Sequence, residues 1–146
     1  MQRGFSLIEV ILVLAVTAIL AATAVLRTGD SLTLRELEDS AQQLAADIRW
    51  TQQETVNRTA GMPTPMITFY SHGYSIEAGL GNRLKPFTRF PVSVQLAGTP
   101  QPLTFTLEGR PAAGATLMLQ QSGKPSRFRF VIVLQTTGRV RVVDRL

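Results

Sequence analysis

The chain begins with a long apolar stretch. From residue 5 to residue 26 nearly every position is apolar, and the interruptions are Ser6, Glu9, Thr17 and Thr23. A helix rises about 1.5 Å per residue, so a run of this length matches a hydrocarbon core about 30 Å thick. The pattern predicts a transmembrane helix over residues 5–26.

A helix with one apolar face is predicted next, over residues 27–61. Gly29-Asp30-Ser31 weakens the helix, and Thr33 followed by Glu36 fits a capping box. Gly and Pro residues at 61–65 end the segment. Between these signals the apolar positions recur every three or four residues. They are Leu34, Leu37, Ala41, Leu44, Ile48 and Thr51. We expect this stripe to pack on a sheet of the same chain.

The remaining residues, 62–146, alternate between short apolar runs and turn residues. The predicted strands are Met66–Tyr70, Tyr74–Ala78, 92–96, 103–107, Ala115–Gln120, Arg127–Leu134 and Arg139–Val143. Residues 79–91 are predicted to form a basic loop. A long helix laid on an antiparallel β-sheet is an α+β arrangement, and this is the fold class that we predict.

Glu9 is the single charged residue in the apolar run. A conventional secretory signal is one alternative, because Arg3 precedes the run and Ala22-Thr23-Ala24 would serve as a cleavage site. The chain would then be a secreted β-rich domain behind a cleavable signal. Glu9 argues against this alternative, because an acidic side chain costs up to about 3 kcal/mol at the bilayer centre. Such a charge predicts a functional role and a partner.

The segment Gly4-Phe5-Ser6-Leu7-Ile8-Glu9-Val10 resembles the processing motif of type IV prepilins and type II secretion pseudopilins. The resemblance implies that prepilin peptidase removes residues 1–4 by cleaving between Gly4 and Phe5, and that Phe5 is N-methylated. It also implies a single pass through the bacterial inner membrane, with the N-terminus cytoplasmic and the globular domain outside. The subunit would later enter a pilus or pseudopilus filament.

Glu9 also has a physical reason to act in assembly. After cleavage, Phe5 would carry an α-amino group one helical turn from Glu9, at the same depth in the membrane. In a staggered bundle the amine of a neighbouring subunit would neutralise the carboxylate and set the axial register. The alternative is that Glu9 extends toward the membrane surface. We predict the assembly role, with other pilin or pseudopilin subunits as partners.

The charge is uneven along the chain. The total is +5, of which residues 1–79 carry −3 and residues 80–146 carry +8. A basic half suggests a polyanionic partner such as nucleic acid, or it keeps an exported domain soluble. Residues 100–143 are similar to the C-terminal domain of the minor subunits GspH and FimT, and less closely to the competence pseudopilin ComGD. Gly138-Arg139-Val140-Arg141 matches a Gly-Arg-x-Arg pattern that this resemblance associates with DNA binding.

The predicted C-terminal hairpin places the arginines. Pairing Val140 with Leu134 and Val142 with Ile132 keeps these four apolar residues on one face. That register gathers four arginines on the opposite face, namely Arg127, Arg129, Arg139 and Arg141. Such a cluster could hold successive phosphates in a salt-sensitive manner. The alternative is that the arginines only protect a strand from aggregation.

We predict no enzyme, no cofactor and no metal site. The chain has no cysteine and one histidine, His72, in a predicted turn. The principal hypothesis is a minor pilin or pseudopilin, a structural subunit of a secretion or pilus machine. The second hypothesis is a DNA-binding minor pilin of a DNA-uptake machine.

Overall fold

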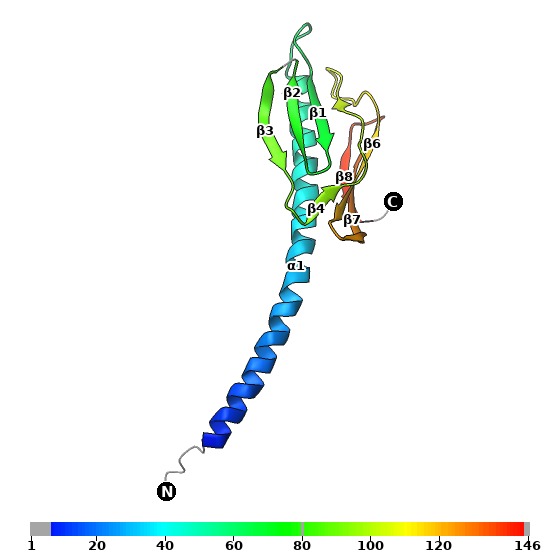
Figure 1. The fold of residues 1–146 in the computed structure, drawn as a ribbon. Helices are drawn as coiled ribbons and strands as arrows, with labels where there is room; N and C mark the ends of the chain where they lie inside the picture. The colour runs from blue at the N-terminus through cyan, green and yellow to red at the C-terminus, as the bar shows by residue number, and fades with distance from the viewer. Residues whose placement is uncertain (1–6, 80, 145–146) are drawn as a thin grey trace. The chain divides into compact units, whose positions relative to one another are not determined.

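The structure, a computed structural model, describes residues 7–79 and 81–144, with residues 23–30 described by their backbone alone. The chain divides into two compact units, Met1–Leu32 and Thr33–Leu146. Within the described residues the elements are one helix and eight strands (Figure 1). They are α1 (Leu7–Val56), β1 (Pro65–Tyr70), β2 (Gly73–Ala78), β3 (Arg83–Arg89), β4 (Val94–Leu96), β5 (Leu103–Thr104), β6 (Ala115–Gln121), β7 (Lys124–Val133) and β8 (Val140–Val143).

Helix α1 includes the predicted weak point at residues 29–31 and ends at Val56 rather than at residue 61. Thr33 and Glu36 therefore lie inside a helix and do not begin one, so the predicted capping box is wrong. Both side chains bond to the strand-rich part instead. The Thr33 hydroxyl accepts a hydrogen bond from the Gln121 side-chain amide at 3.2 Å. The Glu36 carboxylate accepts one from the Ser93 hydroxyl.

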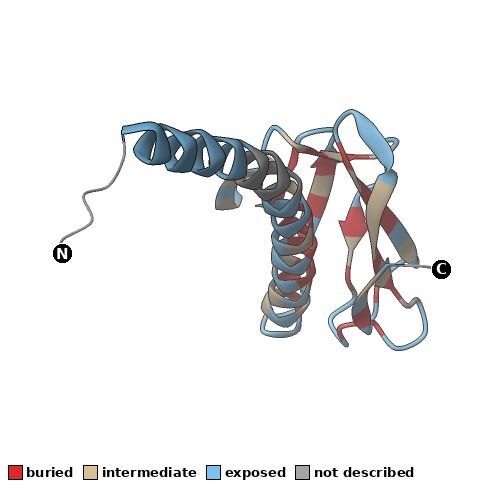
Figure 2. Cartoon of the chain, turned by 90° about the horizontal axis from the view of Figure 1, so that it is seen from below, coloured by how far each residue is buried: buried red, intermediate tan, exposed pale blue. Residues whose placement is uncertain are grey.

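The predicted apolar stripe is buried on the side of α1 that faces the strands (Figure 2). It begins at Leu37 rather than Leu34, which is 38% exposed. The buried residues of the stripe are Leu37, Ser40, Ala41, Leu44, Ala45, Ile48, Thr51 and Thr55. Thr51 and Thr55 donate their hydroxyl groups to helix carbonyls four residues earlier, each at 2.8 Å. These bonds satisfy the hydroxyl groups inside the core.

The strands form two four-stranded antiparallel sheets, where the sequence predicted one. Their strand orders are β3-β2-β1-β5 and β4-β6-β7-β8. One apolar core joins the buried face of α1 to both sheets, for example through Ile67 of β1 and Leu117 of β6. A helix packed on antiparallel sheets confirms the predicted α+β class.

Two strand predictions are wrong. Residues 83–89, predicted as loop, form β3 at the edge of its sheet, where Pro86 is tolerated because an edge strand has one unpaired side. Residues 103–107, predicted as one strand, pair only at β5 and through an isolated bridge between Phe105 and Pro111. A tight turn follows this bridge, because Gly109 has φ +80° and donates its N–H to Thr106 O.

The predicted register of the C-terminal hairpin is wrong by one residue. Val140 lies opposite Val133, and Val142 lies opposite Val131. Val131 and Val133 are buried, whereas Ile132 is only half-buried. Strand β7 is apolar on both faces, so its own pattern cannot set the register. The pairing of β7 with β6, whose Leu117 is fully buried opposite Val131, selects the face that enters the core.

Candidate functional site

The N-terminal part of α1 leaves its apolar side chains uncovered. Ten large apolar side chains between Leu7 and Leu20 are each at least 46% exposed within the described structure. They lie at consecutive positions as well as at helical spacing, so they surround the helix rather than forming one stripe. An exposed apolar surface of this extent marks a site of interaction. Among the described residues, no helix has a segment long and apolar enough to cross a membrane.

Glu9 lies in the first turn of α1 and is exposed. Thr17, a polar residue farther along the same surface, donates its hydroxyl to Val13 O at 2.9 Å. The Thr17 hydroxyl is thus satisfied within its own helix, so this position suits an apolar environment. The Glu9 carboxylate is charged, and a charge on an apolar surface is costly unless a group outside the helix pairs with it. Gly4 and Phe5, the predicted cleavage and methylation positions, lie outside the described residues.

The four arginines of the predicted cluster lie on both faces of their sheet. Arg129 is on the same face of β7 as Val131, and its Nε donates to Glu38 Oε2 at 2.6 Å. Arg127, two residues earlier on that face, has its Nη1 3.5 Å from Gln121 Oε1. Arg141 pairs with Ile132 and so occupies the opposite face. The predicted clustering of all four arginines is therefore wrong, because it depended on the wrong register.

The Glu38–Arg129 pair connects α1 to β7. Hydrogen bonds from Gln42 and then from Arg129 hold the pKa of the Glu38 carboxyl below its usual value. Half-exposed ion pairs contribute little on their own, about 0–1 kcal/mol. The pair fixes the orientation of the Arg129 side chain more than it stabilises the fold.

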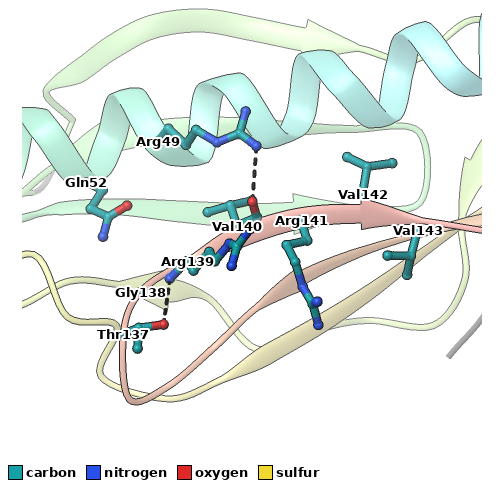
Figure 3. A pocket seen from close by; sticks show the side chains of 9 residues that line it. All are labelled: Arg49, Gln52, Thr137, Gly138, Arg139, Val140, Arg141, Val142 and Val143. Carbon is teal, nitrogen blue, oxygen red and sulfur yellow. Dashed lines mark hydrogen bonds between the residues drawn. The ribbon is translucent and has the colours of Figure 1, made fainter.

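The last two arginines line an open groove of about 650 Å³ between α1 and β8 (Figure 3). Arg139 and Arg141 contribute from the β8 side, and Arg49 and Gln52 from α1. The Arg49 guanidinium donates to Val140 O at 3.1 Å across this groove. Arg49 lies outside the predicted apolar stripe, and the sequence did not indicate this contact, because periodicity shows the face of a residue but not its distant contacts.

Gly138, the first residue of the Gly-Arg-x-Arg pattern, is required by local packing. Its φ is +67°, a conformation that favours glycine. A Cβ at this position would lie 2.5 Å from Gln52 Nε2 and 2.8 Å from Gly109 O. Gln52 Nε2 also donates to Gly109 O at 2.5 Å. The turn before β8, the 106–111 loop and α1 therefore meet at Gly138.

A second polar cluster, which the sequence did not indicate, joins α1 to β2 and β3. The Tyr74 hydroxyl donates to Asp47 Oδ2 at 2.6 Å, and Lys85 Nζ lies 2.7 Å from Asp47 Oδ1. Lys85 also lies 4.1 Å from the centre of the Trp50 ring. Burial, and then the hydrogen bond to Asp47, raises the pKa of Tyr74 well above its usual value. This cluster holds edge strand β3 to the helix.

His72 lies exposed in the turn between β1 and β2. Its Nδ1 is 2.8 Å from the hydroxyl of Ser71, its neighbour in the sequence. Among residues 7–79 and 81–144, no three His, Cys, Asp or Glu side chains are placed to hold a metal ion. The absence of a catalytic or metal role for His72 stays a prediction.

Comparison with known proteins gives three similarities. Residues 1–25 match the prokaryotic N-terminal methylation motif. The chain is 42% identical to the type II secretion system protein H of Pseudomonas aeruginosa over 63 residues, which are 42% of this chain and 37% of that protein. The fold matches the crystal structure of the type IV minor pilin FimU of P. aeruginosa with a TM-score of 0.56 and 19% identity, over 73% of this chain and 92% of that one.

These similarities support membership of the type IV pilin and pseudopilin family. The methylation motif covers the segment on which the sequence resemblance rested. The likeness to FimU concerns the fold alone at this level of identity. The chain spans little more than a third of the length of protein H, so the role of that protein does not transfer to this chain without further argument. The two relatives are named as a secretion protein and a pilin, and neither favours the competence alternative.

Proposed function

We propose that this chain is a minor pilin or pseudopilin, a structural subunit of a type II secretion pseudopilus or a type IV pilus machine, anchored at the inner membrane before assembly. The observation that carries the proposal is the N-terminal methylation motif leading into a helical segment with exposed apolar side chains, in which Glu9 is the single charged residue of the apolar run. A surface of this kind is stable when lipid or other helices cover it. The partners are other subunits of the same filament, together with prepilin peptidase before assembly.

Glu9 sets the position of one subunit against the next in this proposal. Prepilin peptidase cleaves after Gly4, and the new amino group of Phe5 is N-methylated. The cationic amine of one subunit pairs with the Glu9 carboxylate of its neighbour. An unpaired charge in an apolar bundle is costly, so the pairing favours one axial offset between helices over all others.

The processing step is tested by the intact mass of the membrane-extracted protein. We expect a chain that begins at N-methylated Phe5, because the motif specifies both cleavage and methylation. A mature chain that begins after Ala24 would support the secretory-signal alternative and contradict the proposal.

The assembly step is tested with Glu9→Ala and a matched control, Thr17→Ala. Both remove a polar group from the same exposed surface, but the Thr17 hydroxyl is already bonded within its own helix. We expect Glu9→Ala to leave cleavage and membrane insertion intact and to abolish or severely reduce incorporation into filaments. Thr17→Ala should be incorporated like the unaltered chain. Equal incorporation of the two variants would show that the Glu9 carboxylate does not pair between subunits.

The competence hypothesis is not adopted as a second function. That hypothesis required four arginines on one face of the hairpin. In the structure Arg129 is paired with Glu38, on the opposite face of the sheet from Arg141. DNA binding by Arg139 and Arg141 stays a prediction of the sequence pattern. It is one of the outcomes that the experiment on β8 below distinguishes.

A further inference from the structure

Strand β8 has an unpaired edge. It is the last strand of the order β4-β6-β7-β8, so within the described residues it pairs on one side only, with β7. Leu134 N donates to Arg139 O at 3.1 Å. In an antiparallel pair the backbone groups of successive residues point alternately toward the partner and away from it. Arg139 and Arg141 therefore direct their backbone groups toward β7, and Val140 and Val142 direct theirs outward.

The groove between α1 and β8 runs along this edge (Figure 3). The bond from Arg49 to Val140 O crosses the groove and is consistent with the outward direction of that carbonyl. Among the described residues that line the groove, three are arginines and none is acidic. The groove thus combines positive charge with the hydrogen-bonding groups of an unpaired strand.

The side chains of β8 divide between the two faces of the sheet. Val140 and Val142 face the core, and Arg141 lies on the outer face beside Ile132. In an added strand, the residue opposite Arg141 would also lie on the outer face, within reach of its guanidinium. Residues opposite Val140 and Val142 would turn toward α1. An acidic residue at alternate positions therefore complements this edge.

We infer that β8 accepts an extended acidic segment of another protein, which adds to the sheet as a fifth strand. Strand addition uses backbone hydrogen bonds for affinity and alternate side chains for specificity. Strand β8 has four residues, so at about 3.3 Å per residue the matching segment spans about 13 Å. A nucleic acid would use the arginines and the N–H groups, but its phosphates would be repelled by the outward carbonyl oxygens. A peptide uses both kinds of backbone group, although at Val140 O it would share the carbonyl with Arg49 or displace it. This use of both groups favours a peptide.

The arginines also fit the ordinary protection of an edge strand. Charged side chains on an edge discourage pairing with like-charged or apolar strands. The same charges attract an acidic strand, so protection and selective pairing make different predictions for acidic and basic peptides. Asp144 follows β8 and repels acidic side chains. The acidic residues of the partner would therefore lie near Arg139 and Arg141 rather than near the C-terminal end of the strand.

The charge requirement is tested with the full chain in detergent micelles. The probe is a fluorescein-labelled seven-residue peptide of alternating Glu and Val with blocked ends, and the control replaces each Glu by Lys. We expect at least tenfold tighter binding of the glutamate peptide at low salt, measured by fluorescence anisotropy. Arg141→Glu, a substitution at an exposed position, should sharply reduce this preference. Equal binding of the two peptides to the unaltered chain would overturn the inference.

The backbone requirement is tested with Val142→Pro against Val142→Thr. Both alter the same side chain, but only proline removes the outward N–H. Trp50 fluorescence verifies that each variant is folded. We expect the proline variant to bind the glutamate peptide at least tenfold more weakly than the threonine variant. Equal affinities would contradict strand addition.

A third probe separates peptide from nucleic acid. Tight binding of a ten-nucleotide oligothymidylate that Val142→Pro leaves unchanged, and that Arg139→Ala with Arg141→Ala abolishes, would identify a phosphate site and overturn the inference. Weak oligothymidylate binding beside proline-sensitive peptide binding would support it. None of these measurements requires processing or filament assembly, so their failure is distinguishable from failure of the proposed function.

Discussion

Gly138→Ala should destabilise the strand-rich unit by about 2–3 kcal/mol. An L-residue at φ +67° costs about 1–2 kcal/mol relative to glycine. The added Cβ would also lie 2.8 Å from Gly109 O, a backbone atom that cannot move alone. It would lie 2.5 Å from Gln52 Nε2, whose displacement breaks a hydrogen bond worth about 0.5–1.5 kcal/mol.

Gly123→Ala is the matched control. Gly123 has a similar φ of +76°, but a Cβ there would meet nothing within 4 Å. It should therefore cost only the backbone strain of about 1–2 kcal/mol. The excess cost of Gly138→Ala over Gly123→Ala measures the junction between α1, the 106–111 loop and the turn before β8.

Urea unfolding followed by Trp50 fluorescence measures both variants, because Trp50 is the single tryptophan of the chain and packs against the core. A double-mutant cycle with Gln52→Ala adds a second measurement. If the excess arises at the junction, Gly138→Ala should cost less once the Gln52 side chain is absent. The reasoning is refuted if the two glycine substitutions cost the same. Gly138 would then be required for a ligand or for backbone conformation alone.

Two further predictions concern pH and register. Burial raises the pKa of Tyr74 in the folded chain. The contribution of Tyr74 to folding stability is therefore complete below the unfolded pKa of about 10. As pH rises above this value, the free energy of unfolding falls by up to about 1.4 kcal/mol per pH unit. Tyr74→Phe should remove this part of the decline in urea unfolding measured between pH 9 and 11.5, and an unchanged decline would assign it to other groups. Cysteines at Val131 and Val142 should form a disulfide on mild oxidation, because these residues lie directly opposite each other. A cysteine at Ile132 in place of Val131 should prevent the bond. Efficient bonding between positions 132 and 142 would instead support the register predicted from the sequence, in which these two residues lie opposite each other.

The helix stripe and the first hairpin could be predicted because local signals agreed with the packing. The predicted stripe residues Leu37, Ala41, Leu44 and Ile48 recur at the period of a helix, and all four are buried. The strands on either side of Ser71-His72 appear where the sequence placed them. In both cases a single apolar face has only one way to reach the core.

The predictions for β3, expected as a loop, and for the register of β7 with β8 were wrong because the local sequence pattern of both strands is ambiguous. Strand β3 contains Pro86 and three basic residues, a composition typical of a loop, yet an edge strand tolerates it. Strand β7 alternates two usable faces, one with Val131 and Val133 and one with Phe130 and Ile132. The contact with β6 chooses between the faces, and this contact joins residues that are distant in the sequence.

The polar contacts could not be predicted from periodicity. Asp47, Arg49 and Gln52 lie outside the predicted apolar stripe, and each bonds to a strand or loop more than 25 residues away. A helical pattern gives the direction of a side chain but not what lies in that direction. Long polar side chains at the margin of a buried stripe are therefore the positions where sequence reasoning most needs a structure.

The two units bury their apolar residues differently, and the difference separates stability from function. The residues from Leu37 onward that face the strands are covered by their own chain, whereas the ten large apolar residues between Leu7 and Leu20 are each at least 46% exposed within the described structure. Truncating a side chain such as Ile48 should therefore cost about 2–5 kcal/mol of folding stability. Truncating Leu12 removes no contact of the described core, so any effect must come through lipid or partner helices. Residues that leave unfolding unchanged but alter incorporation into filaments should consequently concentrate in the first unit.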